Sequence, residues 1–146
     1  MFIRTMRLED YDTLYQLWLS CQGMGLNNLD DSREGVAVFL KRNPHTCFVA
    51  EDKGTLLGAI MAGHDGRRGY IYHTAVHPDH RRQKIASRLT EHSLEALQKE
   101  GIHKVALLVF SKNQAANAFW ENMGFSSRDD VTYRNKAVSS LIRIDT

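Results

Sequence analysis

One stretch, residues 70–100, restricts what this chain can fold into more than any other. Residues 70–76 are apolar and β-prone, and Pro78 ends this pattern because proline has no N–H to donate to a strand ladder. Further on, apolar residues recur at helical spacing, at Ile85, Leu89, Ala96 and Leu97. The sequence therefore predicts a strand, a loop and a long amphipathic helix in direct succession.

The loop between this strand and this helix carries a cluster of positive charge. It reads His80-Arg81-Arg82-Gln83-Lys84. The first turn of a helix has N–H groups without intrahelical partners and lies at the positive end of the helix dipole, so it attracts anions. Neighbouring arginines add charge and forked donors for a phosphate. Composition alone favours a solvated basic turn, so the phosphate-binding interpretation depends on the rest of the chain.

The rest of the chain supplies motifs in a definite order. Val76-His77-Pro78 precedes the loop segment Arg81–Ala86, and Asn113-Gln114-Ala115-Ala116 and Gly124-Phe125 follow it. This succession resembles the GCN5-related N-acetyltransferase (GNAT) superfamily, which has Val-x-Pro, Arg-x-x-Gly-x-Gly/Ala, Asn-x-x-Ala and Gly-Phe in that order. The resemblance covers roughly the whole chain and favours phosphate binding by the loop. One position differs, because Lys84 stands where the family usually has its first glycine.

The resemblance and the local patterns both imply an α/β fold, with a GNAT-type mixed, mostly antiparallel central sheet and helices on both faces. We expect one domain over residues 1–146, since a chain of this length usually forms one. Helices are predicted over residues 11–21, after Asp31 or Ser32 as N-cap, over 85–100 and over 115–123. Strands are predicted over residues 2–6, 47–50, 56–62, 70–76 and 104–110, with one or two weak strands between 131 and 144.

Residues 104–110 are nearly continuously apolar, which is typical of a strand covered on both sides. The strand–helix–strand order predicts that they form a central strand parallel to residues 70–76. Cys21 and Cys47 lie in apolar patterns without metal-ligand or disulfide spacing, so we expect reduced core thiols. The histidines also show no metal-ligand spacing, and we expect no metal site.

The resemblance implies an acetyl-CoA-dependent N-acetyltransferase that transfers the acetyl group directly to a primary amine of a small molecule or protein. Acetyl-CoA is then the cosubstrate, with its pyrophosphate on the loop N–H groups and its pantetheine arm between two parallel strands. The residues to which the resemblance assigns cofactor binding are Ala75, Val76, Arg81, Arg82, Gln83, Lys84, Ile85, Ala86, Asn113, Ala116 and Trp120. Asn113 is also a good N-cap for the helix that follows it. For Lys84 we expect an ordinary negative φ with the side chain turned outward, because a positive φ strains a residue with a Cβ.

The acid and the base of the reaction are less well defined by the sequence. The family frequently has a tyrosine as the acid, four residues before the glycine of Gly-Phe, and Trp120 stands there in this chain. Tyr133, in the predicted C-terminal strands, is our candidate for that role. His73 has the best-placed intrinsic pKa of the candidate bases on the strand beside the site. A structural histidine, with a water chain leading to a carboxylate, is the alternative.

Other function classes fit the composition less well. A net charge of +2 is too small to indicate a nucleic-acid partner, and the basic cluster at residues 80–84 lacks aromatic interleaving. No apolar run is long enough for a membrane span and no signal peptide is apparent, so we expect a cytoplasmic protein without a membrane partner. A homodimer and a catalytically weak acyl-CoA sensor of the same fold are open alternatives. Asp30, Asp31 and Glu34 suggest either a cationic acceptor or a solvated acidic turn.

Overall fold

The sheet of the computed structural model, which describes residues 1–146, has five strands in the order β1-β2-β3-β4-β5. The first four strands pair antiparallel, and β5 pairs parallel to β4. The bounds are β1 (Phe2–Thr5), β2 (Phe48–Asp52), β3 (Thr55–His64), β4 (Gly69–Val76) and β5 (Val105–Leu107). The predicted mixed, mostly antiparallel sheet is therefore confirmed.

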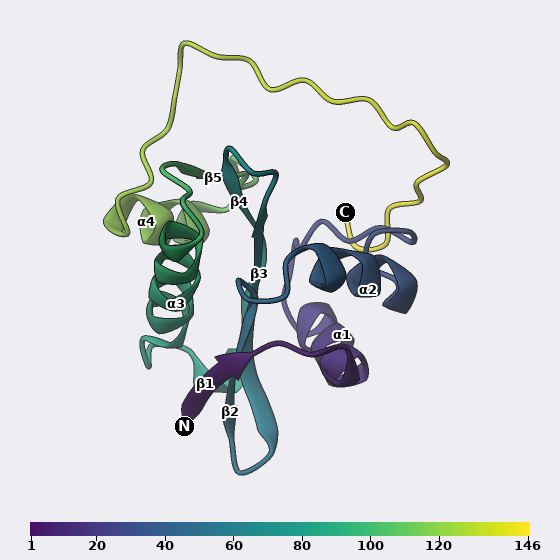
Figure 1. Cartoon of the computed structure of the whole chain (residues 1–146), viewed down its shortest axis with the longest axis vertical. Coiled ribbons are helices and arrows are strands. Elements are labelled where there is room, and N and C mark those ends of the chain that lie inside the picture. The colour runs from purple at the N-terminus through teal and green to yellow at the C-terminus, as the bar shows by residue number, and fades with distance from the viewer.

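The helices cover both faces of this sheet (Figure 1). α1 (Tyr11–Leu19) and α2 (Arg33–Arg42) lie on one face, and α3 (Ile85–Lys99) and α4 (Gln114–Asn122) lie on the other. Short 3₁₀ turns at Leu8–Asp10 and Pro78–His80 precede α1 and α3. None of the helices combines the length and the apolar character needed to cross a bilayer.

The ends of the helices follow local sequence signals. The Ser32 hydroxyl accepts a hydrogen bond of 3.0 Å from the Gly35 N–H and so caps α2, as predicted. Asn113 caps α4 in the same way, accepting from the Ala116 N–H at 3.1 Å. Gly101 follows α3 with a φ of 85°, a conformation that suits glycine after a helix C-terminus.

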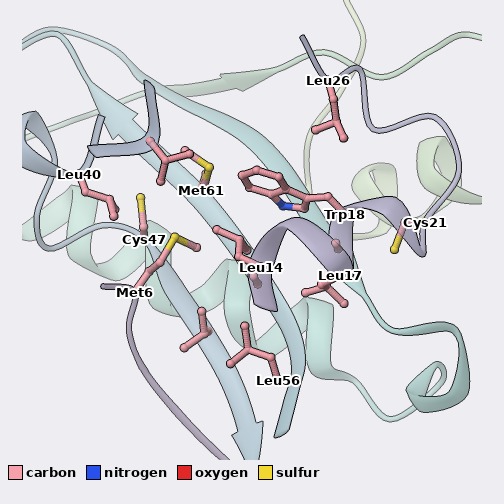
Figure 2. Packing of buried hydrophobic residues seen from close by; sticks show 14 residues of the cluster. Met6, Leu14, Leu17, Trp18, Cys21, Leu26, Leu40, Cys47, Leu56 and Met61 are labelled. Carbon is pink, nitrogen blue, oxygen red and sulfur yellow. The ribbon is translucent and has the colours of Figure 1, made fainter. Parts of the chain in front are cut away.

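Two apolar layers hold the helices onto the sheet. Beneath α1 and α2, Trp18 is fully buried and lies over the sheet among Leu14, Leu26 and Met61 (Figure 2). Beneath α3 and α4, the fully buried side chains include Ile60, Ile71, Ile85, Leu89 and Leu97. Because β3 contributes to both layers, its sequence is continuously apolar from Leu56 to Ala62.

The β2–β3 hairpin closes through a two-residue turn at Lys53 and Gly54. Both residues have a positive φ, 49° and 82°, as a type I′ turn requires. Glycine adopts this conformation freely, whereas Lys53 adopts it against the steric preference of its Cβ. The strands predicted over residues 47–50 and 56–62 are thus the two arms of a hairpin, and Lys53 in its turn is one of three non-glycine residues in the left-handed region.

A bulge interrupts β4 opposite Met61. Between the pairs Ile60↔Thr74 and Ala62↔Ile71, β3 advances by two residues and β4 by three. Tyr72 and His73 therefore face the same side, where Tyr72 meets Phe39 of α2 and His73 meets Trp18 of α1. Bulges bend a strand and redirect its side chains. The parallel β5 ladder ends at Ile71, directly before this bulge.

The predicted strand over residues 104–110 differs from the observed β5. The strand has only three residues, Val105–Leu107, and it is the last strand of the sheet rather than a central one. Leu108 and Phe110 are 55% and 45% exposed, although their sequence context suggested burial. The physical reason is that β4 offers straight backbone for pairing only up to the bulge, so β5 has no further partner.

The C-terminal segment also differs from prediction. After α4 the chain arches across the end of the sheet where β4 and β5 lie, and it ends beside α2 (Figure 1). Residues 126–141 are exposed and form no strand, because the arch carries them away from any strand with which they could pair. The weak strands predicted between residues 131 and 144 are therefore wrong, apart from one isolated bridge between Asn27 and Arg143.

The last residues return to the connection between α1 and α2. Asp145 accepts hydrogen bonds from the N–H groups of Met24 and Leu26, at 2.9 and 2.7 Å. Ile142 and Asn28 bond to each other, through the Asn28 N–H at 3.0 Å and the Asn28 side chain at 2.6 Å. We call residues 142–145 the C-terminal clamp, since they fix the backbone of residues 24–28.

Two further features support the sheet. Arg4 of β1 donates two hydrogen bonds to Asp10, at 2.9 and 2.8 Å, and also contacts Glu51 of β2. Both cysteines are buried and free, as predicted. Burial raises the pKa of Cys47 to about 12, and its thiol donates to the Ala62 carbonyl at 3.2 Å.

Candidate active site

The loop that precedes α3 presents a series of unpaired backbone donors. None of the N–H groups from Arg81 to Ser87 donates a hydrogen bond within the protein, and the first bond of the helix is Arg88 N–H to Lys84 O at 3.1 Å. These donors lie at the positive end of the dipole of a long helix. Such a concave run of free N–H groups is suited to an anion with several oxygens, such as a pyrophosphate.

A cavity of about 300 Å³ lies against this loop. Val76 and Phe119 line it from β4 and α4, and the remaining walls come from His80, Arg81, Arg82, Lys84, Ile85, Ala86 and Ser87. The lining therefore includes most of the loop residues to which the sequence resemblance assigned cofactor binding. Gln83 belongs to the same loop but does not line the cavity.

The backbone of this loop is strained at two positions. Arg82 and Lys84 have φ values of 63° and 61°, in the left-handed region. The ordinary negative φ expected for Lys84 is therefore wrong. Lys84 takes a conformation that glycine would take more easily, and it does so within the run of N–H groups that have no partner in the protein. Such strain persists where the surrounding structure enforces it, and it clusters at functional sites.

The Arg81 side chain, which belongs to a residue lining the cavity, makes contacts within the protein. Its Nε donates to the Val76 carbonyl at 3.1 Å, and its Nη2 lies 3.6 Å from the Cys21 sulfur. The Cys21 thiol donates to the same carbonyl at 3.5 Å. Arg81 thus joins the end of α1 to the end of β4, while its backbone N–H stays without a partner in the protein.

The edge of β4 is open where it approaches the loop. Because β5 pairs with β4 only over Gly69–Ile71, residues 72–76 of β4 have no strand neighbour on that side. Ala75 is buried within this segment, and Val76 reaches the cavity. An extended, amide-containing arm could add to this edge as a further strand does. The open edge and the anion cradle form one continuous path.

His73 lies within this open segment and is contacted from two sides. Its Nε2 is 2.6 Å from a carboxylate oxygen of Asp31, and its ring meets the Trp18 ring edge-on at 4.9 Å between centroids. The His73 side chain is 13% exposed, whereas that of Asp31 is 5% exposed. The other oxygen of Asp31 accepts the Asn27 N–H at 2.8 Å. The Nδ1 atom of His73 forms no hydrogen bond.

Tyrosines continue the surface beyond His73. Tyr70 and Tyr72 lie with ring centroids 4.6 Å apart, and Tyr72 also packs edge-on against Phe39. Burial, and then the nearness of Tyr133, raise the pKa of Tyr70 to about 12. Burial and then Asp30 raise the pKa of Tyr72. The exposed C-terminal arch thus brings Tyr133 close enough to Tyr70 to act on it electrostatically.

Two of the residues in α4 that the resemblance assigned to cofactor binding, Ala116 and Trp120, lie on the buried face of this helix. Trp120 is 8% exposed and packs edge-on against Phe119 and Phe125, at 4.8 and 5.3 Å between centroids. Ala116 is half-buried in the same layer, and Phe119 reaches the cavity. The Asn113 side chain is used as the helix cap described above. The structure therefore gives Trp120 a packing role in the layer next to the cavity.

The residue that the sequence reasoning missed is Asp31. The sequence suggested it as an N-cap of α2, as part of a solvated acidic turn or as part of a site for a cationic acceptor, whereas its carboxylate turns inward onto His73. Ser32 takes the cap position in its place. The sequence contained one hint. If Ser32 caps α2, the adjacent Asp31 is not needed as the cap and its carboxylate is available for another contact. Its partner lies 42 residues further along the chain, which no local pattern identifies.

Comparisons with known proteins agree with this geometry. A family model described as "Acetyltransferase (GNAT) family" matches residues 11–125. An acetyltransferase of Sodalis glossinidius is 32% identical to this chain, over 93% of the chain and 94% of the relative. The family match extends from the start of α1 to the Gly-Phe motif and includes Asp31, His73 and the loop before α3.

Solved structures share the fold at lower sequence identity. Ard1 from Thermoplasma volcanium superimposes with a TM-score of 0.76 at 20% identity, over 86% of this chain and 82% of that one. The PaiA N-acetyltransferase from Thermoplasma acidophilum, solved in complex with coenzyme A, gives a TM-score of 0.74 at 19% identity, over 89% and 92% of the two chains. At these identities the likeness concerns the fold alone.

Proposed function

Because this chain belongs to the GNAT family of acetyltransferases, we propose that it transfers an acetyl group from acetyl-CoA directly to a primary amine of a small molecule or protein. The observation that carries this proposal is the run of free N–H groups from Arg81 to Ser87, facing a cavity at the end of an open strand edge. This arrangement suits a ligand with a pyrophosphate at one end and an extended amide arm at the other.

The residues present fit such a cosubstrate. The loop N–H groups would hold the pyrophosphate, and the exposed Arg82 and Lys84 side chains would add positive charge beside it. The open backbone of β4 at Ala75 and Val76 would hold the pantetheine arm. Acetyl-CoA, when bound, supplies the activated acetyl group, and its thioester would lie near the Ala75 end of this path.

The proton transfers are assigned to residues beside that position. We assign to His73 the role of general base, because its Nδ1 has a free lone pair and lies on the open segment of β4. Nδ1 takes a proton from the acceptor ammonium, so that the nitrogen lone pair can form the C–N bond while the C–S bond breaks. Tyr133 is our candidate for returning a proton to the thiolate, from the exposed arch near Tyr70.

The test has a binding arm and a turnover arm. We expect CoA to raise the melting temperature of the protein, whereas pantetheine, which lacks the phosphates, should raise it much less. Arg82→Ala should weaken CoA binding about tenfold, whereas Arg67→Ala, an exposed arginine of the β3–β4 turn, should not. Equal shifts with CoA and pantetheine would contradict the phosphate assignment.

For turnover, acetyl-CoA is mixed with a panel of primary amines and release of free thiol is followed. Acetylation of at least one amine supports the enzyme. CoA binding without turnover of any amine would favour the sensor of the same fold instead. One observation gives that second function some support, because Trp120 stands buried in the core at the position of the family's tyrosine acid.

A further inference from the structure

We propose that Asp31 is a positioning residue that fixes the orientation and the tautomer of His73. This inference deepens the proposed function and rests on the assignment of His73 as base. The two side chains come from separate parts of the chain, Asp31 from the connection between α1 and α2 and His73 from the bulge of β4. Their 2.6 Å contact is the only hydrogen bond that the His73 ring makes.

The chemistry of the pair selects one tautomer. A carboxylate accepts hydrogen bonds and does not donate them, so Nε2 of His73 must carry the hydrogen that faces Asp31. The neutral ring then has its lone pair on Nδ1, which no group of the protein occupies. When Nδ1 takes a proton, the ring becomes positively charged beside a buried carboxylate, which stabilises it.

Asp31 is itself fixed by hydrogen bonds, so it can hold the His73 ring in one orientation. One carboxylate oxygen accepts the Asn27 N–H at 2.8 Å, and its backbone carbonyl accepts the Tyr11 hydroxyl at 2.6 Å. The side chain has therefore little freedom to follow a moving histidine. Packing of the Trp18 ring against His73 restricts the imidazole from the other side.

One unsatisfied polar atom lies beside the same histidine. Among buried side-chain nitrogen and oxygen atoms, only Trp18 Nε1 and Thr74 Oγ1 lack a partner. Trp18 contacts the His73 ring, whereas Thr74 pairs with Ile60 and so faces the layer beneath α3 and α4. Buried groups without partners are rare in folded proteins, and the one on Trp18 belongs to the ring that packs against His73.

The experiment begins with a readout that needs no turnover. In protein with ¹⁵N-labelled histidine, we expect the His73 side chain to show a protonated Nε2 and an unprotonated Nδ1. Asp31→Asn preserves size and can keep its oxygen on the Asn27 N–H, which turns its NH2 group toward Nε2. Because that NH2 group donates, the tautomer preference should be lost or reversed, with the hydrogen moved to Nδ1. Asp30→Asn removes the same charge from the neighbouring exposed residue and should leave the His73 spectrum unchanged.

The kinetic arm uses the best amine of the panel. We expect Asp31→Asn to lower kcat by about 10- to 100-fold while KM for acetyl-CoA changes less than twofold, because the cradle is untouched. His73→Gln should lower kcat at least as much. The double variant Asp31→Asn with His73→Gln should be no slower than His73→Gln alone, since Asp31 acts only through the histidine. An unchanged melting temperature with CoA shows that each variant is folded.

The outcomes separate this inference from the proposed function. A wild-type tautomer preference in Asp31→Asn, or additive losses in the double variant, would overturn the positioning role even if the enzyme is active. If no amine is acetylated, the proposed function fails, but the tautomer measurement still decides whether Asp31 orients His73. Full activity in His73→Gln would reject the histidine as base and Asp31 with it.

Discussion

Replacing Lys84 with glycine should stabilise the free protein. Lys84 has a φ of 61°, and this conformation costs a residue with a Cβ about 1–2 kcal/mol relative to glycine. Glycine also lowers the unfolding free energy by about 0.4–1 kcal/mol, because it has more conformational entropy in the unfolded chain. The net stabilisation is therefore about 0.5–1 kcal/mol, which raises the melting temperature of a domain of this size by about 2–3 °C.

The turn residue Lys53 provides a matched control. Lys53 has a φ of 49°, and Lys53→Gly makes the same change of side chain as Lys84→Gly. Lys53 lies in the β2–β3 hairpin, away from the loop before α3. Lys53→Gly should therefore stabilise the protein by a similar amount and leave CoA affinity unchanged. Thermal unfolding followed by circular dichroism measures the first quantity, and calorimetric titration with CoA measures the second.

The two variants together test how the loop works. Because the loop already has the left-handed backbone in the free protein, Lys84→Gly should keep CoA affinity within about threefold, or roughly 0.7 kcal/mol. A lower melting temperature for Lys84→Gly, with the expected rise for Lys53→Gly, would refute the strain argument. A loss of CoA affinity beyond tenfold would mean that the lysine side chain itself binds phosphate.

Two further predictions concern the core and the acid. Asp10→Asn should destabilise the protein by about 2–3 kcal/mol, measured by urea unfolding, because it leaves the Arg4 guanidinium without its main partner. Burial alone would raise the pKa of Asp10, but hydrogen bonds from Arg4 and from the Arg7 N–H lower it overall, so this stability is present above about pH 4 and is lost as the pH falls further. In Asp10→Asn, the part of the unfolding free energy that the wild type loses below about pH 4 should be missing. An equal loss of unfolding free energy at low pH in the variant and the wild type would contradict the assignment. Trp120→Tyr should raise kcat about tenfold or more if its hydroxyl reaches the departing thiolate, with KM for acetyl-CoA unchanged and about 1–2 kcal/mol of packing lost. No rise in kcat would show that another group, such as Tyr133, already supplies the proton.

The parts of the molecule that the sequence predicted well depend on neighbouring residues. Pro78 ends a strand and Ile85 begins a helix for reasons contained within a few positions of each, so β4, the loop and α3 could be placed in advance. The same holds for the Ser32 and Asn113 caps. The anion cradle was within reach because it is built from the backbone of one continuous segment.

The parts that were missed depend on distant partners. The length of β5 is set by a bulge in β4, and nothing in residues 104–110 indicates where pairing with another strand must stop. The φ of Lys84 is opposite to the preference of the residue itself, so the residue type could not predict it. Asp31 became interpretable only when the fold brought it to His73.

The C-terminal clamp has a consequence for the order in which the site is completed. Asp145 bonds to Met24 and Leu26 across sequence separations of 121 and 119 residues, whereas the β2–β3 hairpin joins near neighbours. During synthesis from the N-terminus, the sheet strands and α3 are therefore available to fold long before residue 145 emerges. The connection that bears Asp31 is among the last parts to be fixed, and with it the orientation of His73. A nascent chain should acquire the loop before α3 first and the fixed contact between Asp31 and His73 only after residues 142–145 have emerged.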